Sequence, residues 1–225
     1  DGGSFFSALQ QAQALGYAEA DPTQDLNGGD IRRKLVISAN IAFGCVLDET
    51  EVAVMGIEAL RSEDIGAFRR MNRVCKLVAG ARKLNGSVAA YIEPALFLPS
   101  VHEAAVPENF NLISLTGLHI GKQSFYGQGA GRYPTAYNVL QDCVDVRNGL
   151  HHFYTSKLQP LPVDNSGIRR QYYVRSGGVD KWLQSRIDKI LDCGIITEPV
   201  SVAEMHLWAQ ERKQAGAECF FASLR

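Results

Sequence analysis

The chain of 225 residues has no apolar run near the length of about 18 residues that a membrane-spanning helix needs. Its start, Asp1-Gly2-Gly3, lacks the basic and apolar stretches of a secretion signal. Basic and acidic residues nearly balance, 23 against 24, so no excess of charge points to nucleic acid or to an anionic membrane. These absences predict a cytoplasmic protein with neither partner.

Metal-ligand patterns are missing as well. The five cysteines are odd in number and form no CxxC pair, and the five histidines show no HxxxH or HExxH spacing. We therefore expect no metal site and no disulfide framework, and predict buried, reduced thiols instead. At about 150 residues per domain, the length corresponds to one large domain and a small one.

Helical and strand patterns are mixed along the first 150 residues. Apolar residues at three- and four-residue intervals predict helices over 4–15, 30–43 and 62–70. Asn85-Gly86 predicts a hairpin turn between strands, because a type I′ turn needs positive φ at both positions. The expected strands cover 76–84, 87–91, 97–98, 112–115, 118–120 and 124–126, and a helix of about sixteen residues with an apolar stripe at Val139, Cys143 and Val146 follows Pro134. The pattern indicates an α+β fold with a mixed or antiparallel sheet and helices on one face.

The C-terminal part has its own organisation. Residues 157–167 have the composition of a linker, so we predict domains over 1–156 and 168–225. The second domain is predicted to contain strands over 171–175, 195–200 and 218–224 and helices over 179–191 and 203–215. This βαβαβ order resembles an abbreviated ACT-type regulatory module with one strand fewer than usual. The alternative is a degenerate packing domain, in which Trp182, Ile187 and Ile190 are core residues at helical spacing.

The densest polar cluster runs from Gly16 to Lys34. Asp30 and Lys34 are four residues apart at the start of a helix, so their side chains project from one face. A solvent-exposed pair contributing about 0.2–0.5 kcal/mol is the simpler interpretation. However, four carboxylates precede the lysine within sixteen residues, on a loop that enters a helix, where catalytic groups tend to lie. A protonated lysine there can give its proton to a developing alkoxide.

A second cluster is the glycine-rich segment 127–131, directly before a predicted helix. Glycines let backbone N–H groups approach a ligand, and a helix N-terminus favours an anion. The segment is not a GxGxxG fingerprint, and a tight strand-to-helix turn explains it equally well.

Together these segments resemble homoserine dehydrogenase. Residues 16–34 read Gly-Tyr-x-Glu-x-Asp-Pro-x-x-Asp-Leu-Asn-Gly-x-Asp-x-x-x-Lys, which is similar to the catalytic signature of that family. Residues 125–136, Phe-Tyr-Gly-x-Gly-Ala-Gly-x-x-Pro-Thr-Ala, resemble its later loop on the cofactor side. Between them, residues 93–99 and His102 are similar to the family's Pro-x-Leu-Leu-Pro…His segment. The resemblance covers roughly residues 4–150.

The resemblance implies an oxidoreductase that interconverts aspartate 4-semialdehyde and homoserine with NAD(P), in threonine and methionine biosynthesis. It further implies the family's catalytic and dimerisation domain, and a homodimer or higher homo-oligomer. Lys34 takes the role of the general acid, and Asp30 orients it and the reacting oxygen.

The remaining site residues follow from the same resemblance. Glu19 is implied to bind the amino group of the substrate, with Asp25 supporting the charge network. Gly16 and Tyr17 are implied to line the edge between substrate and nicotinamide. The backbone of Gly129 and Gly131 is implied to approach the dinucleotide.

The family's N-terminal Rossmann domain has no counterpart among these 225 residues. We therefore expect NAD(P) to be bound mainly by a domain absent from this chain, and the isolated chain to be inactive. The competing hypothesis is a non-catalytic module derived from the enzyme. In that case the strands of 76–91 and 112–126 serve dimerisation, and the C-terminal domain senses an amino acid.

Overall fold

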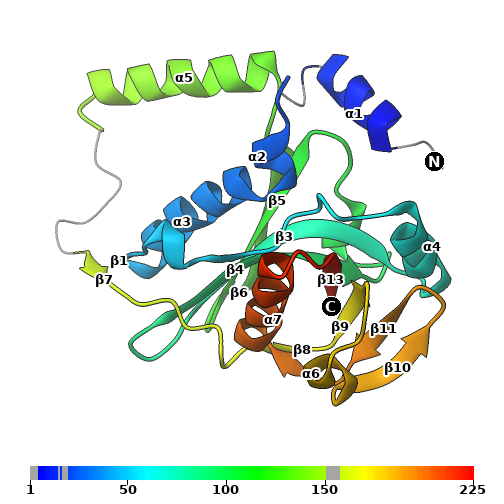
Figure 1. Ribbon diagram of the computed structural model, residues 1–225. Helices are drawn as coiled ribbons and strands as arrows, with labels where there is room; N and C mark the ends of the chain where they lie inside the picture. Colours follow the sequence, from blue (N-terminus) through cyan, green and yellow to red (C-terminus); the bar gives the residue numbers. More distant parts are fainter. Residues whose placement is uncertain (1–4, 15, 17–19, 151–157) are drawn as a thin grey trace. The chain divides into compact units, whose positions relative to one another are not determined.

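The computed structural model describes residues 5–14, 16, 20–150 and 158–225, which belong to two compact units (Figure 1). One unit comprises the described residues up to Pro22 and from Ser100 to Leu150, and the other those from Thr23 to Pro99 and from 158 to Arg225. Among the described residues, no helix is both long enough and apolar enough to cross a membrane.

The first unit contains a two-stranded antiparallel hairpin. The turn spans residues 118–120, between Gly117 and Gly121, so the strand predicted there is wrong; Gly121 adopts the positive φ that closes the turn. Lys122 donates to Glu103 and lowers the pKa of that carboxyl. The elements of this unit are α1 (Phe5–Ala14), η2 (His102–Ala105), β5 (Phe110–Gly117), β6 (Gly121–Gln128) and α5 (Arg132–Arg147).

Helix α5 differs from the expectation in one respect. Its length of sixteen residues agrees with the prediction, but the stripe of Val139, Cys143 and Val146 is exposed, and none of its residues is buried. Val139, for example, is 56% exposed. The spacing of these apolar residues gives α5 one apolar face, which could pack against another element. Nothing in the described part of the chain buries that face.

The second unit is built on a seven-stranded sheet, and its central strand is β4 (Val88–Phe97). Strand order is β10-β11-β9-β13-β4-β2, with β3 also paired to β4. The pairs of β4 with β2 and β13 are parallel and the others antiparallel, which confirms the mixed sheet of an α+β fold. The other strands are β2 (Ala53–Val54), β3 (Val74–Lys83), β9 (Tyr172–Ser176), β10 (Ile187–Leu191), β11 (Gly194–Thr197) and β13 (Cys219–Leu224).

The β3–β4 hairpin confirms the turn predicted at Asn85-Gly86, where Gly86 has a φ of 83°. Both strands are longer than expected, and the separate strand at 97–98 is wrong, because Phe97 is the last residue of β4. Nine of the ten β4 residues are buried. A strand buried to this extent lacks the alternation on which the sequence prediction depends.

Helix α3 (Gly29–Phe43) packs against this sheet through the apolar stripe that the sequence predicts. Ile31, Leu35 and the buried Ala39 belong to one core cluster with Val88 and Ile92 of β4. Helix α4 (Ser62–Arg70) has the predicted bounds. The bounds of α7 (Val202–Gln214) differ by one residue at each end from the predicted range of 203–215. The shorter elements of the unit are α2 (Thr23–Leu26), α6 (Lys181–Gln184), β1 (Cys45–Val46), η1 (Glu49–Glu51), β7 (Gln159–Pro160), β8 (Arg169–Arg170) and β12 (Val200–Ser201).

The helix predicted over 179–191 is wrong. The chain forms only the short α6, whose N-cap Asp180 accepts from the Leu183 N–H, and then enters β10. The β-branched Ile187 and Ile190 suit a strand better than a helix. Ile190 is 75% exposed and therefore not a core residue, whereas Trp182 does stack on Trp208.

With β10 included, the C-terminal segment has the order βαββαβ. Its strands lie in the order β10-β11-β9-β13 and all pair antiparallel, which is the split βαβ arrangement. The strand thought to be missing is therefore present. The domain boundaries at 156 and 168 stay a prediction, although one sheet crosses them and β7 of the expected linker pairs with β1.

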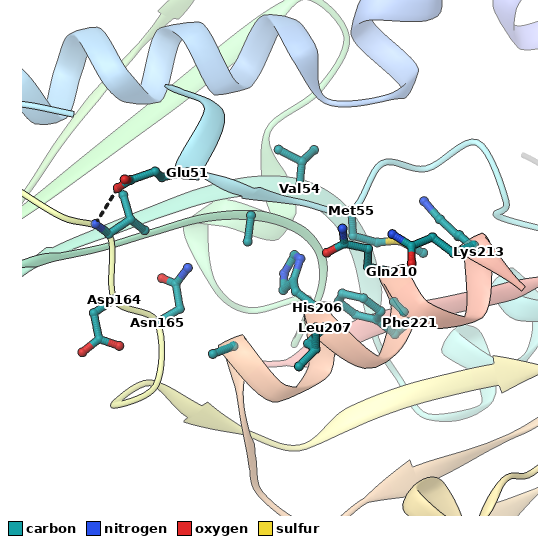
Figure 2. A pocket seen from close by; sticks show the side chains of 15 residues that line it. Glu51, Val54, Met55, Asp164, Asn165, His206, Leu207, Gln210, Lys213 and Phe221 are labelled. Atoms are coloured by element: carbon teal, nitrogen blue, oxygen red, sulfur yellow. Dashed lines mark hydrogen bonds between the residues drawn. The ribbon is translucent and has the colours of Figure 1, made fainter. Parts of the chain in front are cut away.

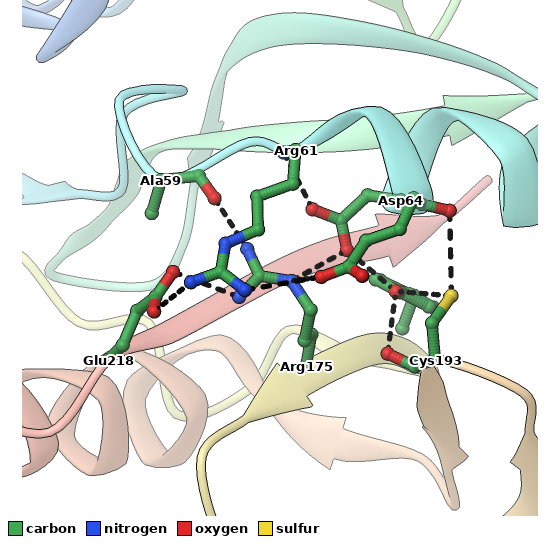
Figure 3. Close-up of polar contacts among 8 residues, drawn as sticks. Ala59, Arg61, Asp64, Arg175, Cys193 and Glu218 are labelled. Atoms are coloured by element: carbon green, nitrogen blue, oxygen red, sulfur yellow. Dashed lines mark hydrogen bonds and ion pairs between the residues drawn. The ribbon is translucent and has the colours of Figure 1, made fainter.

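A buried polar network joins α4 to the C-terminal strands (Figure 3). Asp64 is fully buried and accepts from the Arg61 N–H at 2.8 Å, the Tyr173 hydroxyl at 2.7 Å and Arg175 Nε at 2.9 Å. Arg175 also donates to Glu218 at 3.1 Å. Burial and the hydrogen bonds with Cys193 and Asp64 raise the pKa of the Tyr173 hydroxyl. The network satisfies a carboxylate that would otherwise be costly to bury.

We predict that Asp64→Ala costs about 3–5 kcal/mol of unfolding free energy, because it removes the buried carboxylate that Arg175 Nε and the Tyr173 hydroxyl both engage. Asp192→Ala is the matched control, since Asp192 pairs with Arg70 on the surface and should change stability by less than about 0.5 kcal/mol. Urea unfolding of both variants measures the difference. Equal costs for the two substitutions would contradict the role assigned to Asp64.

All five cysteines are free. Cys45 and Cys219 are buried as expected, Cys75 and Cys193 are partly buried, and Cys143 is exposed, so the expectation of buried thiols is wrong for Cys143. Burial raises the pKa of Cys75 to about 12. The Cys75 thiol therefore stays protonated in the folded protein at pH values where an unfolded cysteine ionises.

We predict a matching order of alkylation by iodoacetamide. At pH 8.5 Cys143 should react first, and Cys75 only at the rate of unfolding, because the thiolate is the reactive form. Since the folded pKa lies above the unfolded one, Cys75 also lowers stability as pH rises above about 9. Mass spectrometry of timed samples checks the order, and early modification of Cys75 in folded protein would refute it.

Candidate active site

The loop that leads into α3 lies directly against the sheet. Gly28 has a φ of 84°, and a Cβ there would lie 2.9 Å from Val54 Cγ1 and 3.3 Å from Ile92 Cγ2. The Asn27 side chain accepts the Gly29 N–H at 2.8 Å at the start of the helix. Glycine is therefore required at position 28 both for its backbone conformation and for the close approach of β2 and β4.

Gly56 supports the same loop from the other side. A Cβ on Gly56 would lie 2.7 Å from Asn27 Cα and 2.9 Å from its carbonyl carbon, and the Ile57 N–H donates to the Leu26 carbonyl at 2.8 Å. These are backbone atoms, so no flexible side chain can move away to make room. Sequence reasoning missed this position, although an isolated glycine in an apolar run is a recognised signal of close backbone approach.

The structure brings Asp30 and Lys34 together as the spacing predicts. Lys34 Nζ lies 2.6 Å from Asp30 Oδ2, and the two side chains are 57% and 42% exposed. The opposite face of α3, with Ile31 and Leu35, packs on the core. Because an ammonium group has three protons and Asp30 accepts one, Lys34 retains two donors for another oxygen.

The exposed face of α3 continues beyond this pair with apolar side chains. Ile37 and Ile41 follow Lys34 at helical spacing and are 53% and 52% exposed. Arg32 lies to one side, with its guanidinium 3.5 Å from Glu49 of η1. The pair therefore lies at the end of a partly apolar surface, and not in a uniformly charged one.

The structure describes some of the other predicted site residues but not all of them. Asp25 lies in the short helix α2 with an exposed side chain, and Gly16 adopts a left-handed φ of 71°. Tyr17 and Glu19 lie outside the described residues. Gly16, Gly129 and Gly131 belong to the first unit and Asp25, Asp30 and Lys34 to the second. Their roles stay predictions.

The glycine-rich segment is shaped by its own unit. The Gly129 N–H donates to the Asn109 carbonyl at 2.9 Å, and the Asn111 side chain occupies the space that a Cβ on Gly129 would need. Gly131 is the N-cap of α5 with a φ of 121°, and no side chain caps that helix. The first-turn N–H groups of α5 are thus not used by a capping side chain, and the first turn holds no acidic residue.

A buried carboxylate that sequence reasoning missed is Glu93, in the middle of β4. It is fully buried and lies 3.4 Å from the Tyr172 hydroxyl, 3.3 Å from His206 Nε2 and 3.2 Å from an Arg225 guanidinium nitrogen. All three partners come from the C-terminal segment, at separations of 79, 113 and 132 residues. No local sequence signal reveals contacts at such separations.

No group of three histidine, cysteine, aspartate or glutamate side chains in the described ranges comes together as a metal site would require. The Asp30–Lys34 ion pair on α3 is a candidate for proton transfer, and the N-terminus of α5, which no side chain caps, is a candidate place for an anion.

The mixed sheet and the helices packed on it match the catalytic-domain fold of a dehydrogenase. The chain belongs to the homoserine dehydrogenase family, whose model matches residues 1–144. A homoserine dehydrogenase from Thiobacillus denitrificans has a similar solved structure, with a TM-score of 0.78 and 27% identity, covering 100% of this chain and 59% of that one. The structural likeness thus includes the C-terminal segment.

Two relatives in sequence agree with this assignment. An NAD(+)-dependent homoserine dehydrogenase from Pseudomonas canavaninivorans is 41% identical over 143 residues, which are 63% of this chain and 41% of the relative. A homoserine dehydrogenase from Neisseria gonorrhoeae is 32% identical over 193 residues, or 80% of this chain and 44% of the relative. The chain therefore spans less than half the length of these two relatives.

We predict that Gly56→Ala costs about 1–3 kcal/mol of stability, since the added methyl group meets the backbone of the Asn27 loop. Gly66→Ala in α4 is the matched control, because its Cβ would meet only the end of the Arg70 side chain, at 3.5 Å. Alanine in that helix should stabilise the protein by about 0.4–1 kcal/mol. Urea unfolding distinguishes the two signs, and a neutral Gly56→Ala variant would contradict the close approach.

Proposed function

We propose that the chain is the catalytic part of a homoserine dehydrogenase, which interconverts aspartate 4-semialdehyde and homoserine with NAD(P). The observation that carries the proposal is the Asp30–Lys34 pair with its 2.6 Å separation, at the start of a helix within the part that the family model matches. The reduction of an aldehyde to an alcohol needs one hydride and one proton. The described structure offers a proton donor suited to the second requirement.

In this reaction Lys34 acts as the general acid. Its Nζ gives a proton to the carbonyl oxygen of the substrate while that oxygen gains negative charge, and takes the proton back in the reverse direction. Asp30 accepts one N–H of the ammonium and thereby fixes where the other two point. When bound, NAD(P)H supplies the hydride to the carbonyl carbon.

Substrate binding is assigned to the acidic segment before α3. Glu19 binds the ammonium group of the amino-acid substrate, Asp25 supports the charge network, and Gly16 and Tyr17 line the edge toward the nicotinamide. This assignment is supported by the match to the family signature, in which these residues and Lys34 occur at fixed spacing. An acidic recess also suits a substrate that carries a positive charge.

The residues present fit a small part of a dinucleotide. The N-terminus of α5, with Gly131 as its N-cap and Arg132 next to it, offers N–H groups and a positive charge to a phosphate. Gly129 leaves room for the Asn111 side chain, and its own N–H group is already engaged within the chain and is not free to bind a phosphate. Most of the NAD(P) surface is assigned to a nucleotide-binding domain outside this chain.

A regulatory function of the C-terminal segment is a second candidate. Its βαββαβ order and antiparallel strand order are those expected of an ACT-like module, which supports amino-acid sensing in a homodimer or larger homo-oligomer. The two functions are compatible, since a sensing module can accompany a catalytic domain in one chain.

We predict that Lys34→Ala lowers kcat about 10²–10⁴-fold in a polypeptide that includes the nucleotide-binding part, the usual contribution of a general acid. Lys189→Ala, on the exposed side of β10, is the control for loss of one positive charge. Steady-state NAD(P)H absorbance gives the rates, and unfolding curves show whether the fold persists. A Lys34→Ala rate within a few-fold of the wild type would contradict the assigned role.

The isolated chain of 225 residues is expected to turn over homoserine with NAD or NADP at a negligible rate, because it lacks most of the proposed cofactor surface. The assay uses the same absorbance readout with excess substrate and cofactor. Measurable turnover would show that the cofactor is held within this chain and would overturn that part of the proposal.

A further inference from the structure

A groove of about 490 Å³ lies in the second unit, and neither Asp30 nor Lys34 is among the residues that line it (Figure 2). One wall is α7, which contributes Ala203, His206, Gln210 and Lys213 along a single face. The opposite wall is formed by the segment from Glu51 to Met55 and by residues 163–165. The volume lies within the range of small-molecule sites.

One end of the groove is negative. Glu51 Oε2 accepts the Val163 N–H at 3.1 Å, and Asp164 Oδ1 accepts the Ser166 N–H at 2.9 Å. Hydrogen bonds from Ser166 lower the pKa of Asp164, which favours the carboxylate form. Both carboxylates are thus held in place by neutral donors, and within the described part of the chain neither forms an ion pair.

The other end is positive. Lys213 lies in the last turn of α7, and no ion pair engages it among the described residues. The Val202 N–H donates to the Ile168 carbonyl at 2.8 Å, which fixes the segment following Asp164 near the beginning of α7. Figure 2 likewise shows Glu51 and Asp164 at one end of the groove and Lys213 at the other.

The separation of these charges limits what can bind both. The eleven residues from Ala203 to Lys213 are separated by ten helical steps, which rise about 15 Å along the helix, and the lysine side chain spans part of that length. A single amino acid, whose charged groups are adjacent, is too short. Three residues of extended peptide reach about 10 Å, a length that suits the groove.

The middle of the groove also suits a peptide. Leu207, which is 56% exposed, and the partly buried Val54 provide apolar surface, and the exposed amides of Gln210 and Gln214 can donate to and accept from peptide groups. We propose that this groove binds a short, extended peptide, with its N-terminal ammonium at Glu51 and Asp164 and its C-terminal carboxylate at Lys213. The site is independent of the function proposed for α3.

The test uses tri-L-alanine as the probe and titrates it into the full chain by calorimetry and ligand-observed NMR. We expect measurable binding that weakens with added salt, because the charges at both ends are exposed to solvent. N-acetyl-tri-alanine lacks the ammonium and tri-alanine amide lacks the carboxylate. Each should bind at least fivefold more weakly than tri-alanine, and L-alanine should not compete.

Variants assign the two ends. Lys213→Gln should weaken tri-alanine about fivefold and leave the amide unchanged, while Glu51→Gln with Asp164→Asn should weaken tri-alanine and leave the acetylated peptide unchanged. Lys189→Gln is the control for a lost charge elsewhere. Unchanged unfolding curves establish that each variant is folded.

Three results would overturn the proposal: no binding of tri-alanine at millimolar concentration, equal binding of the free and blocked peptides, or equal effects of Lys213→Gln and Lys189→Gln. Because binding is read directly and not through catalysis, none of these results depends on whether the chain is part of a dehydrogenase. Conversely, failure of the Lys34 prediction would leave the peptide site untouched.

Discussion

Strand β4 is shared by parts of the chain that are far apart in sequence, and most of the second unit depends on its pairing. β3 covers one edge of β4 over ten residue pairs. The other edge is divided among Val163, β2 and β13. Ile92 of the same strand also packs in the α3 core cluster, so the position of Lys34 depends indirectly on β4. The active-site candidate and the C-terminal segment are thus attached to one strand.

Signals contained within a few residues predict much of this fold. Helix α4 and the turn at Asn85-Gly86 have local causes, namely an acidic first turn and a glycine with positive φ, and both agree with the structure. The region 179–191 was predicted wrongly because its apolar spacing fits a helix, whereas pairing with β11 makes its second half a strand. The stripe on α5 indicates a helix correctly but says nothing about what covers it.

The candidate site divides in the same way. Asp30 and Lys34 are neighbours by helical geometry alone, so their contact follows from spacing. Glu93 and Asp64 are buried carboxylates whose partners lie many tens of residues away, and nothing in their immediate sequence identifies those partners. For Asp64 the sequence shows only that the residue lies in the first turn of a helix, where it can cap that helix. The sequence does not show the distant contacts that bury its carboxylate.

The pairing of β13 with β4 also bears on how the chain reaches its fold during synthesis. The two strands are separated by more than 120 residues, so part of one edge of β4 stays open until β13 leaves the ribosome. Open edges of buried strands are prone to pairing with other chains. Rapid translation of the C-terminal third, or protection by a chaperone, would therefore favour the native sheet over aggregation.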